Sequence, residues 1–70
     1  MARMPETREF WNEETRFVET VDPTDARFGG DPACFARYAR MQASFAREDG
    51  FGLLAERMIV RAASVNTNVK

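Results

Sequence analysis

The chain has one cysteine (Cys34) and no histidine among its 70 residues, so it can form neither an internal disulfide nor a cysteine–histidine zinc site. A domain of this length buries only about 60% of the surface that its unfolded chain exposes, which leaves it marginally stable. Small domains compensate with disulfides, metals or association with another chain. We therefore expect one domain, residues 1–70, that is completed by homodimerisation or by docking on a larger protein partner.

The composition predicts a folded, water-soluble protein. Hydrophobic residues make up 44% of the chain and include six phenylalanines and one tryptophan, which is enough for a core. No segment approaches the run of about 20 apolar residues that spans a membrane. The polar residues 1–6 do not resemble a signal peptide, and an unpaired thiol fits a reducing compartment, so we expect a cytoplasmic protein.

The hydrophobic pattern predicts an all-α fold of three helices, at about residues 5–21, 32–49 and 52–65, and it predicts no strands. We expect the second and third helices to form an antiparallel hairpin, with the first helix packed across it. Residues 66–70 carry no sustained apolar period and are expected to be frayed.

Local signals set the limits of these helices. Asp22-Pro23 ends the first, because the residue before a proline is pushed out of the helical region. Asp31-Pro32 starts the second, with aspartate at the N-cap and proline at the first helical position. Gly50 is expected to end that helix as a C-cap glycine.

The second helix is apolar around more than half of its circumference, and a helix of that kind is usually covered on two sides. Its bulky face consists of Cys34, Tyr38, Met41 and Phe45. Its alanine face consists of Ala36, Ala39, Ala43 and Ala46, with Phe35 between the two faces. The remaining sector carries the arginine stripe, which we define as Arg37, Arg40 and Arg47.

The other two helices each show an apolar stripe with one notable exception. In the first, Glu14 falls within the apolar stripe, where burial would raise its pKa. We expect it to pair with Arg57, Arg61 or Tyr38 and to fix how the helices dock, since buried charges are usually paired.

In the third helix, the core stripe is Leu54, Met58, Ala62 and Val65, flanked by Ala55 and Ile59. Leu53 and Val60 lie on the opposite face.

Charge is unevenly distributed along the chain. Residues 1–22 contain three basic and six acidic residues, a net charge of −3, whereas residues 35–70 contain six basic and three acidic residues, a net charge of +3. Two interpretations follow from this asymmetry. The acidic first segment folds against the basic later segments, or the later segments present a basic surface to an acidic partner.

The residues offer little for catalysis, and we expect no catalytic site, cofactor or metal. General acid–base catalysis most often uses histidine, and Cys34 has no histidine to act as its base. The spacing of Asp22, Asp25 and Asp31 does not match an EF-hand, and Gly29-Gly30 lacks the pattern of a phosphate-binding loop. We therefore expect a protein that is not an enzyme.

The surplus of apolar helix faces favours a small protein-interaction module that acts as an adaptor, an inhibitor or an accessory subunit. One candidate contact on the third helix consists of Leu53, Arg57 and Val60, and the arginine stripe is a second. Phe28 in the loop is a third, and Asp22-Pro23 could cap a short turn that carries it inward.

The alternative function is a small nucleic-acid-binding regulator that uses the arginine stripe. A helix–turn–helix is not well supported, because Glu56 occupies a position where that motif needs a buried aliphatic residue.

Overall fold

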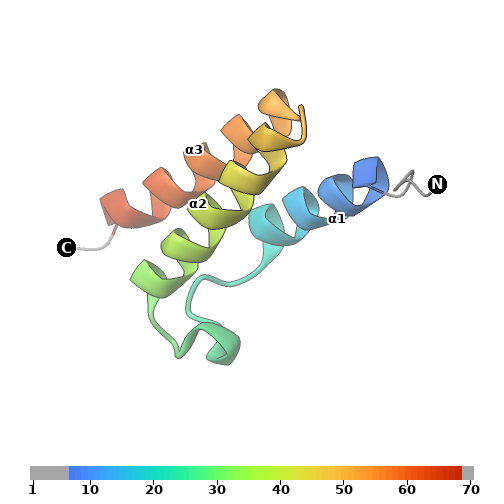
Figure 1. Cartoon of the computed structure of the whole chain (residues 1–70). Helices are drawn as coiled ribbons and strands as arrows, with labels where there is room; N and C mark the ends of the chain where they lie inside the picture. The colour runs from blue at the N-terminus through green and yellow to red at the C-terminus, as the bar shows by residue number, and fades with distance from the viewer. Residues whose placement is uncertain (1–6, 69–70) are drawn as a thin grey trace.

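The computed structural model describes residues 7–68, which form three α-helices and one short 3-10 helix (Figure 1). The elements in chain order are α1 (Thr7–Thr20), η1 (Ala26–Phe28), α2 (Pro32–Glu48) and α3 (Gly52–Asn68). The all-α prediction is confirmed. The start that we expected for the first helix, residues 5–6, lies outside the described residues. The third helix runs three residues beyond its predicted end, to Asn68.

Both ends of α2 are capped as the sequence indicated. The Asp31 side chain accepts a hydrogen bond from the Ala33 backbone nitrogen at 3.0 Å, and Pro32 follows at the first helical position. At the other end, Gly50 has a φ of 93°, and the Phe51 nitrogen donates to the Ala46 carbonyl at 2.9 Å. A glycine in the left-handed conformation, followed by a residue whose nitrogen bonds to the carbonyl five residues earlier, is a Schellman motif. This motif ends α2 and turns the chain back into α3.

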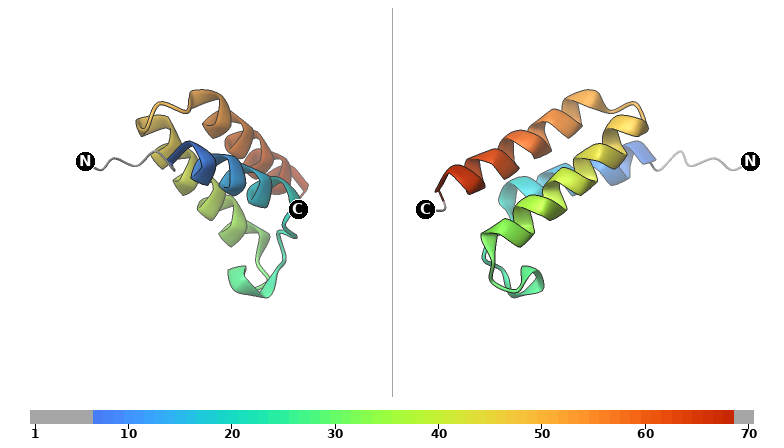
Figure 2. Two further views of the ribbon diagram at one scale, coloured as in Figure 1. Left: turned by 90° about the vertical axis from the view of Figure 1, so that its right-hand side faces the viewer. Right: turned by 60° about the vertical axis from the view of Figure 1, so that its left-hand side comes forward.

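The short turn places α2 and α3 side by side and antiparallel (Figure 2). The alanine face of α2 supplies this contact, and its four alanines are fully buried together with Ala55, Met58 and Ala62 of α3. Small side chains let two helix backbones approach closely. As a result the alanine face is in the core, while Met41 and Phe45 of the bulky face remain about half exposed.

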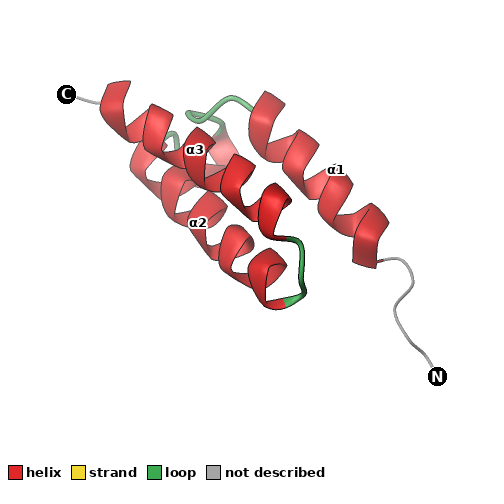
Figure 3. Ribbon diagram, turned by 90° about the horizontal axis from the view of Figure 1, so that it is seen from above, coloured by secondary structure: helices red, strands yellow, loops and turns green. Residues whose placement is uncertain are grey.

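Helix α1 runs alongside α3 in the same direction (Figure 3). Near its start, the Trp11 indole nitrogen donates a hydrogen bond to the Asp49 carboxylate at 3.1 Å. Near its end, the Arg61 guanidinium donates to the Val18 carbonyl at 3.1 Å and the Val21 carbonyl at 3.0 Å. Carbonyls at a helix C-terminus lack partners within the helix, so Arg61 both caps α1 and attaches it to α3.

The turn η1 carries Phe28 into the core. The Asp25 carboxylate accepts from the Arg27 backbone nitrogen at 2.9 Å and so caps this turn. The Phe28 ring lies 5.3 Å from the rings of both Phe35 and Tyr38, and only 7% of the residue is exposed. The inward turn is therefore the alternative that forms, and the role of Phe28 as an interface residue stays a prediction.

Candidate functional site

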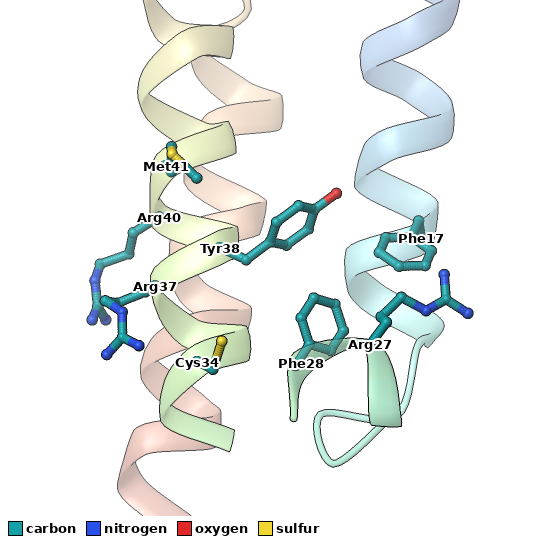
Figure 4. A pocket seen from close by; sticks show the side chains of 8 residues that line it. All are labelled: Phe17, Arg27, Phe28, Cys34, Arg37, Tyr38, Arg40 and Met41. Carbon is teal, nitrogen blue, oxygen red and sulfur yellow. The ribbon is translucent and has the colours of Figure 1, made fainter. Parts of the chain in front are cut away.

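An open groove of about 820 Å³ lies between α1 and α2, with η1 at one end (Figure 4). We call it the α1–α2 groove. Its lining residues are Phe17, Arg27, Phe28, Cys34, Arg37, Tyr38, Arg40 and Met41. The groove is open to solvent. An open groove suits a segment of another protein chain better than a small molecule, which usually binds in an enclosed pocket.

The floor of the groove is aromatic. The Phe17 ring lies 6.0 Å from Tyr38 in an edge-to-face arrangement, and 6.3 Å from Phe28. Figure 4 shows these three side chains converging between the two helices, with Cys34 and Met41 beside them on α2. Cys34 is partly buried and lines the groove beside these rings. Aromatic contacts of this kind hold α1 and η1 against α2.

Arginines border the groove on both sides. Arg37 and Arg40 are exposed on α2 and extend from the side that faces away from α1 (Figure 4). Arg27 lies at the opposite rim, where its guanidinium sits 5.0 Å from the centre of the Phe17 ring and 3.3 Å from the Asp25 carboxylate. Within the part of the chain whose side chains are described, neither Arg37 nor Arg40 has an ion-pair partner.

Glu14 meets one of the three partners that the sequence offered. The Tyr38 hydroxyl donates a hydrogen bond to the Glu14 carboxylate, which links α1 to α2. Partial burial among apolar groups raises the pKa of Glu14 above its ordinary value. The other two expected partners are used elsewhere, since Arg61 caps α1 and Arg57 pairs with Glu19. The contact therefore sets how α1 docks on α2.

We expect the substitution Glu14→Gln to stabilise the domain progressively as the pH rises. Because the pKa of Glu14 is higher in the folded state, its stabilising contribution is complete below the unfolded pKa and is lost as the pH rises through the folded pKa. Glutamine keeps an oxygen that can accept the Tyr38 hydroxyl and removes this loss. Urea unfolding between about pH 3 and pH 7 should show the variant gaining stability relative to the wild type.

The matched control for that experiment is Glu13→Gln, which makes the same chemical change at an exposed position of α1. An equal rise with pH in both variants would contradict the role that we assign to the burial of Glu14.

The surface formed by Leu53, Arg57 and Val60, which we call the α3 patch, is exposed, as its sequence pattern indicated. Leu53 and Val60 project into solvent beside a shallow depression that Glu19 of α1 also lines. Arg57 is held in place by two hydrogen bonds to the Glu19 carboxylate, at 2.8 and 2.9 Å. These bonds raise the pKa of Arg57 further, so its charge is fixed. This is also the one ion pair, among the described side chains, that joins the acidic first segment to the basic later segments.

The structure divides the arginine stripe. Arg37 and Arg40 belong to the α1–α2 groove, whereas Arg47 is exposed on α2 and does not line it. Reasoning from the sequence did not identify Phe17, Arg27 or Met41 as site residues. The bulky face of the second helix was the available signal, because a helix that is apolar on two faces needs two covers and α3 supplies only one.

Two further features bear on possible functions. Within residues 7–68, no three histidine, cysteine, aspartate or glutamate side chains gather as a metal site would require. None of the described helices is long and apolar enough to cross a membrane.

Comparison of the chain with protein-family models, with curated proteins and with solved structures found no match.

Proposed function

We propose that this chain is a small, non-enzymatic, cytoplasmic protein-interaction module that binds a larger protein through its helix faces, as an adaptor, an inhibitor or an accessory subunit. One observation carries the proposal: among the described residues, five large apolar side chains are at least 47% exposed. They are Phe10 (49%), Met41 (50%), Phe45 (47%), Leu53 (79%) and Val60 (66%). Single exposed apolar residues are ordinary, but groups of them on one surface mark binding sites.

Four of these side chains, all except Phe10, belong to two separate surfaces. Met41 lines the α1–α2 groove, and Phe45 continues the same face of α2 one turn later. The α3 patch lies on the other side of α1, because Phe17 lines the groove whereas Glu19, two residues later and about 200° around the helix, lines the patch. A chain with two such surfaces can hold two contacts at once, which suits an adaptor or an accessory subunit.

The α3 patch provides the first test. We expect Leu53→Asp combined with Val60→Asp to abolish capture of the natural partner from the native lysate, because two charges would enter a desolvated contact. The stability of the free protein should change by less than about 0.5 kcal/mol, since both positions are exposed. The measurement is affinity capture with the tagged protein, followed by mass spectrometry, with helicity checked by circular dichroism.

The control carries Ser44→Asp and Ser64→Asp, which place the same two charges at exposed positions outside both surfaces. Capture that is equal for both double variants would remove the α3 patch from the proposal. Self-association is the other way to cover the patch, and sedimentation of the wild type and both double variants distinguishes it. A homodimer formed through this patch would become monomeric in the Leu53→Asp/Val60→Asp variant.

A nucleic-acid-binding regulator is the second candidate, and the exposure of all three residues of the arginine stripe favours it. Binding through phosphate contacts weakens steeply as salt rises. The capture is therefore repeated after nuclease treatment. A partner that survives nuclease supports the protein-interaction module, whereas loss of all captured material after nuclease supports the regulator.

A further inference from the structure

We propose that the α1–α2 groove binds an amphipathic helix that carries acidic residues on both sides of its apolar stripe. The inference rests on the proposed function and names the chemistry of the partner segment for one of the two surfaces. It follows from the aromatic floor of the groove, the arginines on both of its rims, and its open shape.

The floor of the groove matches the apolar side of a helix. Phe17, Tyr38 and Met41 offer an aromatic and thioether surface that runs between α1 and α2. Helices that dock in grooves insert apolar side chains at positions i, i+3, i+4 and i+7. Methionine adapts to differently shaped side chains, and aromatic rings provide large contact areas, so this lining accepts such anchors.

The rims of the groove specify the flanks of the bound helix. Arg37 and Arg40 stand on the α2 side and Arg27 on the η1 side, so guanidinium donors lie on both sides of the apolar floor (Figure 4). The Asp25 carboxylate offsets the charge of Arg27 and contacts its Nε atom, whereas Arg37 and Arg40 have no ion-pair partner among the described side chains. Acidic residues on a docked helix would therefore meet arginines that still have donors to offer, and arginine suits such contacts with carboxylates.

The same charges argue against a second copy of this chain in the groove. A twofold dimer places the same surface on both sides of its interface. A dimer formed through the groove would therefore gather Arg37 and Arg40 of both copies in one contact, and none of them has an ion-pair partner among the described side chains. Like charges in a desolvated contact are costly, so a chain of opposite charge is the better occupant.

Selection from a displayed library of helical peptides tests the inference. The peptides are about 18 residues long, or five helical turns, with a helix-favouring frame and randomised positions, and the full-length protein is the immobilised target. We expect the enriched peptides to combine an apolar stripe with aspartate and glutamate on both flanks. Fluorescence anisotropy then measures the affinity of the most enriched peptide for the wild type and for two charge-reversal variants.

The first variant is Arg37→Glu with Arg40→Glu, and we expect it to bind the enriched peptide at least about tenfold more weakly, because attraction at the rim becomes repulsion. The second is a matched control, Arg16→Glu with Arg47→Glu, which reverses two exposed arginines outside the groove and should bind as the wild type does. Circular dichroism confirms that both variants remain helical.

Several results would overturn the inference. Enriched peptides with neutral or basic flanks, or equal binding to both charge-reversal variants, would leave the proposed function standing while removing this account of the groove. Enrichment of no peptide would do the same, because the capture from lysate does not depend on the library. Displacement of the peptide by a short single-stranded DNA at similar affinity would assign the groove to nucleic acid. A wild-type dimer that the Arg37→Glu/Arg40→Glu variant dissociates would assign it to a second copy.

Discussion

Replacing Phe35 with alanine is expected to destabilise the domain by about 3–5 kcal/mol. The Phe35 side chain is fully buried, its ring packs edge-on against Phe28 at 5.3 Å, and the Arg61 guanidinium lies 5.7 Å from the ring centre. Removing a buried phenylalanine side chain costs about 3–5 kcal/mol. A chain of this size has a total stability of roughly 4–10 kcal/mol, at about 0.05–0.15 kcal/mol per residue, so the loss takes much or all of it. Helicity by circular dichroism and the midpoint of urea unfolding measure the effect.

Phe45→Ala is the matched control for that experiment. It removes the same side chain from the same helix, but Phe45 is about half exposed on the bulky face. We expect a loss of about 1 kcal/mol or less, because little apolar area returns to water. Equal losses in the two variants would contradict the packing of α2 described here. Phe45→Ala should also weaken any partner that extends along this face of α2, which separates a binding role from a folding role.

Helix limits in this chain could be predicted because their signals are local. Asp31 and Pro32 determine the start of α2, Gly50 determines its end, and each acts within one turn of its own position. The core stripe of the third helix was predictable for the same reason. A period of 3.6 residues places Met58, Ala62 and Val65 on one face whatever the rest of the chain does.

The covered face of α2 could not be predicted, because both of its faces are apolar. The pattern alone does not decide whether α3 packs on the alanine face or on the bulky face. The structure selects the alanines, whose small size lets α2 and α3 approach closely, and the bulky face is left for α1 and η1 to cover in part. The α1–α2 groove is a consequence of that choice. It combines residues of three elements, so no local pattern contains it.

The burial of Phe28 and the hydrogen-bond partner of Glu14 also depend on residues that are distant in the sequence. Phe28 becomes a core residue because Phe35 and Tyr38 lie where η1 meets α2. Glu14 meets Tyr38 because Arg61 is occupied by the end of α1. In contrast, the exposure of Leu53 and Val60 was predictable, since α3 has one polar face and both residues lie on it.

The close packing of α2 on α3 leads to the second large effect. We expect Ala43→Leu to destabilise the domain by about 1–3 kcal/mol, even though leucine is a good helix former and adds apolar surface. Ala43 is fully buried in the core that α2 and α3 share, where three additional carbons have no space. The helices must move apart or the new side chain must leave its preferred rotamer, and both responses cost free energy.

Ser44→Leu is the control, because it adds a leucine at the next residue of α2, on its exposed side. Its effect should stay within about 0.5 kcal/mol, and urea midpoints at constant slope compare the two variants directly. If Ala43→Leu proved as stable as the wild type, α2 and α3 would have to lie far enough apart to admit leucine. The alanine face would then no longer explain why α3 covers it in preference to the bulky face. A clear loss confined to Ala43→Leu would instead show that side-chain size decides which face of α2 remains available to a partner.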